Sequence, residues 1–119
     1  MNLEQLENIL NSKKGSTKEY PFGDDVAVFK VINKMFALVL WRELPLKINL
    51  KCLPTDAKIY REIYKCVKPG YHMNKKHWNT ITIDDTIKDE IVIDMINESY
   101  HLVVCKLTKK EKNDLQHHI

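Results

Sequence analysis

The stretch GYHMNKKHWNTI, residues 70–81, concentrates the side chains of this sequence that could do chemistry. Imidazole nitrogens serve as metal ligands and general bases, and lysines with asparagines are typical contacts to nucleic acid. Asparagines beside glycine are also common in turns. The segment therefore raises four interpretations: a metal site, a catalytic centre, a nucleic-acid contact and a structural turn. Its polar and aromatic residues are Tyr71, His72, Asn74, Lys75, Lys76, His77, Trp78 and Asn79.

A metal site would need more ligands than the segment offers. His72 and His77 stand five positions apart, and a third ligand such as His101 would have to approach from elsewhere. Zinc sites use three or four ligands in a defined geometry. Lys75 and Lys76, between the two histidines, would repel a cation. We expect no metal and no other cofactor.

A catalytic centre based on a nucleophile needs a base and an orienting group beside it. Cys66 or a serine could pair with His72 or His77, but no serine stands in a glycine elbow. Asp84 and Asp85 stand where a helix is expected to begin, and the helix dipole accounts for them. The chain has three glycines and no phosphate-cradling glycine motif. We expect a protein that is not an enzyme.

The two remaining interpretations are compatible with each other. Tyr71 and Trp78 have the large apolar rings of structural anchors. Between them, residues 74–76 (NKK) would form a tip whose ammonium groups meet solvent or phosphates. Lys34, with Lys30 close by, stands at the tip of another predicted hairpin. Two basic tips on one sheet would suit the grip of a DNA duplex.

Hydrophobic periodicity predicts the elements that hold these tips. An α+β domain is expected, with the order helix, three strands, helix, two strands, helix, and an antiparallel sheet with helices packed on one face. In LKINLKC (46–52), Lys47, Asn49 and Lys51 share one strand face, which should meet solvent or a ligand. The expected segments are a helix at 3–10, a loop at 11–25, strands at 26–31, 35–41 and 46–52, a helix from Pro54 to Pro69, a strand at 80–83, and a long helix with a capping box at Thr86 and Asp89.

Length and composition predict one soluble domain, residues 1–119, with a charged, frayed tail from about residue 108. The chain is 44% hydrophobic and 29% charged, and its three cysteines form no CxxC pair, as expected in a reducing cytoplasm. The first residues do not form a secretory signal, and no apolar run would span a membrane.

Residues 41–80 carry nine Lys or Arg against three Asp or Glu, within a chain of net charge +3. We expect a cytoplasmic monomer that does not bind membranes.

Four segments, YPFGDDVAVFKV (20–31), KMFALV (34–39), INLKC (48–52) and PGYHMNKKHWNTI (69–81), together resemble the MmcQ/YjbR family of small bacterial proteins. The resemblance spans about residues 15–107. It implies a compact α+β fold comparable to that of bacterial frataxin, and a double-wing mode of DNA binding. The family motif falls on Asn49, Lys51, Tyr71, His72, Met73, Asn74, Lys75, Lys76, His77, Trp78 and Asn79.

The sequence departs from the family pattern in two places. Residues 32–34 (INK) replace a glycine-rich turn, so the first wing is expected to have a longer or distorted turn. Leu53 stands where an acidic residue often caps the second helix, and the loss of the cap costs about 1 kcal/mol.

The sequence thus favours a non-catalytic module that binds DNA without sequence specificity, mainly through phosphates. Lys34, Lys75 and Lys76 would contact phosphates, and Asn74, His77 and Asn79 would donate or accept hydrogen bonds. The alternatives are an interaction protein of another kind, or a pocket in which Asn49, Lys51, His72 and Lys75 or Lys76 converge on a small anionic ligand or a peptide. Protruding lysines favour DNA, and lysines around a concave surface favour a pocket.

Overall fold

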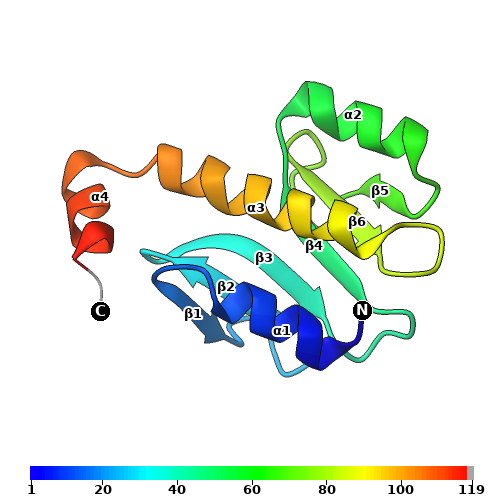
Figure 1. Ribbon diagram of the computed structural model, residues 1–119, viewed down its shortest axis with the longest axis horizontal. Helices are drawn as coiled ribbons and strands as arrows, with labels where there is room; N and C mark the ends of the chain where they lie inside the picture. The colour runs from blue at the N-terminus through cyan, green and yellow to red at the C-terminus, as the bar shows by residue number, and fades with distance from the viewer. Residues whose placement is uncertain (118–119) are drawn as a thin grey trace.

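The computed structural model describes residues 1–117 and contains a six-stranded antiparallel sheet with its helices on one side (Figure 1). The strands lie in the order β1-β2-β3-β4-β6-β5. The predicted α+β class, the antiparallel sheet and the packing of helices on one face are confirmed. The elements are α1 (Leu3–Asn11), β1 (Ser16–Glu19), β2 (Ala27–Val31), β3 (Lys34–Leu40), β4 (Lys47–Lys51), α2 (Pro54–Ile63), β5 (Val67–Pro69), β6 (Trp78–Thr82), α3 (Asp89–Cys105) and α4 (Lys109–Gln116).

Strand β1 lies within the stretch that the sequence predicted as a loop. It pairs with β2, from Ser16 opposite Val31 to Glu19 opposite Val28. An edge strand bonds to one neighbour only, and polar side chains protect its free edge. The segment STKE therefore lacks the apolar alternation by which strands are recognised. The expected loop is thus divided by β1 into two connections, residues 12–15 and 20–26.

Helix α2 is shorter than the apolar pattern predicted. It ends at Ile63, because Tyr64 already has an extended backbone with φ −113° and ψ 118°. Val67, which continues the helical stripe in the sequence, instead begins β5 and pairs with Ile81 of β6. In this position Val67 is buried and its backbone joins the sheet. The start of α2 is as predicted, with Pro54 in the first turn and no side-chain cap from Leu53.

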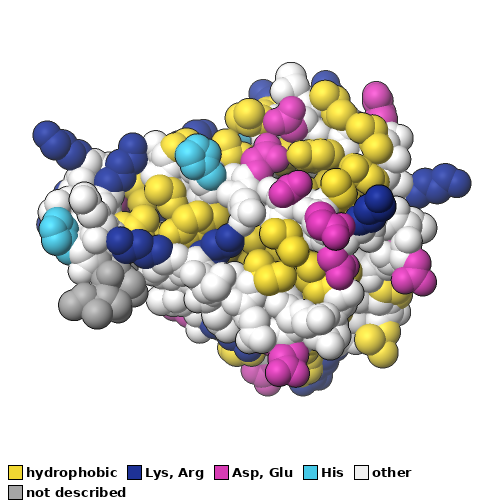
Figure 2. All heavy atoms as spheres, viewed as in Figure 1, with side chains coloured by type: hydrophobic (Ala, Val, Ile, Leu, Met, Phe, Trp, Pro, Cys, Tyr) yellow, Lys and Arg dark blue, Asp and Glu magenta, His cyan; other side chains and the backbone are white. Residues whose placement is uncertain are grey.

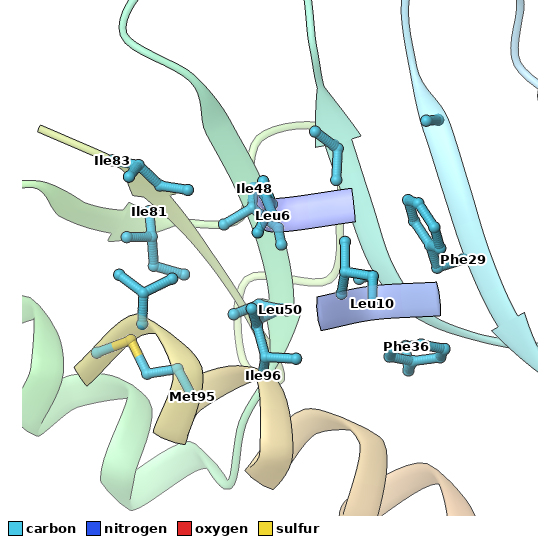
Figure 3. Close-up of a cluster of buried hydrophobic side chains, with 14 of the residues drawn as sticks. Leu6, Leu10, Phe29, Phe36, Ile48, Leu50, Ile81, Ile83, Met95 and Ile96 are labelled. Carbon is cyan, nitrogen blue, oxygen red and sulfur yellow. The ribbon is translucent and has the colours of Figure 1, made fainter. Parts of the chain in front are cut away.

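The main core lies between the sheet and the helices α1 and α3 (Figure 3). Leu6 and Leu10 enter it from α1, and Met95 and Ile96 enter it from α3. Complete burial of such a side chain stabilises the fold by about 1.5–3 kcal/mol. This core fixes the strands whose ends carry the predicted site. The same cluster contains, from the sheet and from Ile83 just beyond β6, the residues Phe29, Phe36, Ile48, Leu50, Ile81 and Ile83.

The C-terminal segment predicted to be frayed forms helix α4. A capping box begins it: the Glu111 N–H donates to Thr108 Oγ1 at 3.1 Å, and the Thr108 N–H donates to Glu111 Oε1 at 2.9 Å. Its one buried side chain, Leu115, packs against Gly15. A Cβ atom on Gly15 would lie only 2.6 Å from Leu115 Cδ1. The cap and this contact order a segment that is otherwise polar.

The capping box predicted at Thr86 is absent. Helix α3 begins at Asp89, and its cap residue Lys88 makes no side-chain capping bond. Thr86 instead donates its N–H to Asp84 Oδ1 at 2.9 Å, in a turn before the helix. The carboxylate of Asp84 satisfies the backbone locally, so Thr86 is not used as a cap.

A two-residue turn joins β2 to β3, where a longer or distorted turn was expected. Ile32 and Asn33 have φ angles of 45° and 63°, the left-handed pair of a type I′ turn. The irregularity lies beyond the turn, where Phe29 pairs with Ala37 but Lys30 pairs with Met35. The extra residue of this bulge is Phe36, whose carbonyl accepts a 2.6 Å hydrogen bond from Ser99 Oγ.

Candidate functional site

The two predicted tips lie at the same end of the sheet. β4 is antiparallel to both β3 and β6, so its last residue, Lys51, lies beside the beginning of each. The turn at residues 32–33 leads into β3, and the loop of residues 70–77 leads into β6. We call this the loop end of the sheet. The sequence predicted the two tips, and the antiparallel register brings them to one side.

The loop between β5 and β6 is held by its own backbone. The Gly70 N–H donates to the Trp78 carbonyl at 2.8 Å, and the Trp78 N–H donates to the Asn74 carbonyl at 3.0 Å. Asn74 Oδ1 also accepts from the Lys76 N–H at 3.0 Å. A Cβ atom on Gly70 would lie 2.8 Å from Trp78 Cβ, so this close approach requires glycine. Asn74 therefore stabilises the turn through its carbonyl and its Oδ1 atom, while its side chain is exposed.

Arg61 of α2 holds this loop from the outside. Its Nε donates to Asn79 Oδ1 at 2.7 Å, and its Nη2 donates to the carbonyls of Lys75 and of Trp78, the latter at 3.4 Å. A guanidinium group can bridge three acceptors because its donors form a rigid fork. The helical pattern places Arg61 on the outer face of α2, so sequence reasoning assigned it no role.

Trp78 and Tyr71, both predicted to be structural anchors, lie in different environments. The Trp78 side chain is 8% exposed and packs with Val28 and Leu38 on the sheet face opposite the helices. Tyr71 is 63% exposed, and its ring lies tilted against that of His72, with centroids 4.0 Å apart and an angle of 51° between the planes. Pairing between β5 and β6 ends at Pro69, so Tyr71 lies in the loop and not in a strand.

Asn49 and Asn79 are buried on opposite faces of the sheet, so they do not join one binding surface. Asn79 is 2% exposed, and its side chain donates to the Ala57 carbonyl at 3.3 Å and accepts from Arg61. Asn49 is 4% exposed and accepts a hydrogen bond from Thr80 Oγ1. The expected polar face of β4 is therefore largely covered. Both asparagines support structure.

A groove of about 670 Å³ lies at the loop end, and we call it the lysine groove. Lys51 and Lys34, predicted to be site residues, both line it. Lys30 also lines it and pairs with Glu19 at 2.9 Å, whereas none of the described lining residues is Asp or Glu. The lining residues are Pro21, Phe22, Lys30, Asn33, Lys34, Met35, Lys51, Trp78, Val103, Lys106 and Leu107.

The remaining predicted residues lie on the 70–77 loop. Lys76 and His72 are exposed, and His72 has a left-handed backbone with φ 58°. Lys75 Nζ donates to the Gly70 carbonyl at 3.2 Å, so its ammonium group folds back onto the loop. His77 is half-buried, and its carbonyl accepts from the Cys52 N–H at 2.8 Å. Of these side chains, Lys76 is the one most open to an anionic ligand.

A second polar cluster lies between α2 and α3, away from the predicted residues. Glu98 accepts hydrogen bonds from the Tyr60 hydroxyl at 3.2 Å and from Cys52 Sγ at 3.9 Å. Burial, followed by the nearby Glu98 carboxylate, raises the pKa of the Cys52 thiol to about 12 and that of Tyr60 to about 12. Burial also raises the pKa of Glu98. A thiol that stays protonated at neutral pH is a poor nucleophile, so the cluster is suited to structure.

Within residues 1–117, no three His, Cys, Asp or Glu side chains come together in a way that could hold a metal ion. Across the same residues, no helix is both long and apolar enough to cross a membrane.

The face shown in Figure 2 is unevenly charged. Lys and Arg side chains surround an exposed hydrophobic patch over the C-terminal part of α3, and Asp and Glu side chains gather between α2 and the beginning of α3. Val103, Lys106 and Leu107, from the end of α3 and just beyond it, line the lysine groove. The basic part of this face thus adjoins the loop end.

Comparison with known proteins identifies relatives of this chain. It is 42% identical over 94 residues to the protein YbdF of Escherichia coli O157:H7, covering 78% of this chain and 76% of that protein. It is 28% identical over 115 residues to YjbR of Escherichia coli strain K12, covering 97% of each.

The fold also has a close counterpart among solved structures. The crystal structure of the Deinococcus radiodurans protein DR2400 matches with a TM-score of 0.89 and 33% identity, over 97% of this chain and 88% of that one. The model of the YjbR family matches residues 11–102, which include the sheet, α2 and most of α3. On this evidence, the chain belongs to the YjbR family.

Proposed function

We propose that this protein binds DNA without catalysis and without sequence specificity, through phosphate contacts at the loop end of the sheet. The observation that carries the proposal is the lysine groove, where lysines from separate segments of the chain face one concave surface. Ion pairing between such lysines and phosphates releases counterions, which drives sequence-independent binding. Among the described helices, α3 reaches this groove with its C-terminal end. A recognition helix contacts base edges with its N-terminal residues, so base readout is not part of the proposal.

The two tips contribute unequally to this surface. Lys34 follows the β2–β3 turn directly and is exposed, and Lys76 is exposed on the 70–77 loop. Lys75 is engaged with the Gly70 carbonyl, so we assign it to the loop and not to a phosphate. Lys106, which sequence reasoning did not single out, is exposed beside the groove and joins Lys34 and Lys76 as a phosphate contact.

A second candidate function is the binding of a small anionic ligand. It is favoured by the shape of the lysine groove, which is concave and has the volume of typical ligand sites, about 300–1,000 Å³. A small anion would contact Lys51 at the end of β4 and would depend little on Lys76 on the loop. A DNA strand would contact both lysines through its phosphates.

The test is fluorescence anisotropy of a labelled 20-base-pair duplex titrated with protein at 50 mM salt. The variant Lys34→Gln/Lys106→Gln removes two charges at the groove, and the control Lys58→Gln/Lys88→Gln removes two exposed charges elsewhere. We expect the groove variant to lose most of the affinity and the control to retain it. No binding by the unaltered protein, or equal loss in both variants, would contradict the proposal.

A further inference from the structure

We propose that the lysine groove accepts an unpaired segment of DNA, with its bases against the apolar part of the groove and its phosphates on the rim lysines. This inference rests on the proposed function and specifies the form of DNA that the same site binds. Phosphate binding alone would not explain the apolar part of the groove. Much of its lining is apolar, and includes Phe22, Met35, Val103 and Leu107.

Phe22 is the most exposed of these side chains. It is 64% exposed, in the loop between β1 and β2, and it lines the same groove as Lys34 and Lys106. A ligand that covers this exposed ring gains the free energy of burying its apolar surface. A nucleotide would suit both features, because its flat base can cover the phenyl ring and its phosphate can pair with the lysines.

Paired and unpaired DNA differ in what they offer to such a surface. A duplex turns its phosphates outward and keeps its base faces stacked inside, so it has no partner for the exposed ring of Phe22. An unpaired strand presents both phosphates and free base faces. Proteins that bind single strands combine a basic groove with aromatic rings on which bases stack. The lysine groove has both parts, and no described Asp or Glu lines it to repel the phosphates.

The size of the groove also suits a nucleotide better than a bare phosphate. Its volume of about 670 Å³ is far larger than a phosphate group requires. Trp78 contributes to the lining but is 8% exposed and packed on Val28 and Leu38. It therefore forms a fixed wall, whereas Phe22 is free to contact a base. We assign the stacking contact to Phe22.

The experiment compares a labelled single-stranded oligo(dT) of 12 nucleotides with a 12-base-pair duplex in anisotropy titrations at the same salt concentration. The test variants are Phe22→Ala, which removes the ring, and Phe22→Tyr, which keeps it. The control Tyr20→Ala removes another exposed aromatic ring at the start of the same loop, one that does not line the groove. Thermal melts establish that each variant is folded.

We expect oligo(dT) to bind more tightly than the duplex. Phe22→Ala should weaken oligo(dT) binding by roughly tenfold and leave duplex binding unchanged, because a stacked base contributes about a factor of ten. Phe22→Tyr and Tyr20→Ala should bind like the unaltered protein. If the duplex binds as tightly as oligo(dT) and Phe22→Ala has no effect on either, the inference is overturned and the proposed function stands. If neither DNA binds, both are overturned.

Discussion

The two connections at the loop end reach the same place by different physical means. The β2–β3 turn is local: two residues in left-handed conformation reverse the chain, and Lys34 already pairs with Val31. The β5–β6 loop is long, and besides its own backbone hydrogen bonds it depends on distant partners, chiefly Arg61 of α2 and the packing of Trp78. The comparison teaches that equivalent positions in a sheet do not imply equivalent stability. Substitutions should therefore affect the two connections differently.

The largest effect is expected from the anchor of the long loop. Trp78→Ala removes a buried indole from the cluster with Val28 and Leu38 and leaves a cavity, so it should lower the free energy of unfolding by about 3–5 kcal/mol. Tyr71→Ala removes an exposed side chain of the same loop, so it should change the free energy of unfolding by less than about 0.5 kcal/mol. Urea unfolding measures both. Similar losses from the two variants would mean that the loop has no dominant anchor.

The next effect tests the clamp on the same loop. Arg61→Met keeps much of the side-chain volume but removes the donors to Asn79 Oδ1 and to the loop carbonyls, so it should cost about 1.5–3 kcal/mol. Lys58→Met on the same helix is exposed and serves as the matched control. Hydrogen exchange should show faster opening of residues 70–77 in the Arg61 variant alone. Unchanged exchange there would refute the clamp.

The smallest stability effect concerns the short turn. Asn33→Ala places at φ 63° a residue that has a Cβ atom but no polar side chain, which should lower the free energy of unfolding by about 1 kcal/mol. Asn33→Gly should lower it little or not at all. Thermal melts separate the two variants. If alanine and glycine were equally tolerated, backbone conformation would not be what holds this turn.

The sequence predicted those parts of the fold that have a repeating apolar pattern. Strands β2 and β3 were predicted from β-rich apolar runs and β4 from alternation, and Pro54 marked the start of α2. Strand β1 was missed because an exposed edge needs no apolar residues, and α4 was missed because its one anchor, Leu115, packs on a distant glycine. Local pattern carries no information about such partners.

The candidate site was predicted less well than the fold, for a related reason. Lys34, Lys51 and Lys76 could be named from the sequence because charge at a strand end or a tip usually remains at the surface. Asn79 shares its strand face with buried Ile81, and that alternation was the one available signal that its amide lies inside. The role of Arg61 depends on how α2 packs beside β6, which the helical pattern does not reveal. Phe22 lies in a loop without periodicity, so its place beside the lysines emerged only from the structure.

The most direct test of the central claim, that both connections at the loop end contact one DNA molecule, is the salt dependence of duplex affinity. Lys34→Gln removes one charge beside the short turn, and Lys76→Gln removes one charge on the long loop. Each should reduce the steepness of log affinity against log salt by about 0.9, and the double variant by about 1.8, with stability changed by less than about 0.5 kcal/mol. A double variant with the same slope as the unaltered protein would contradict the claim.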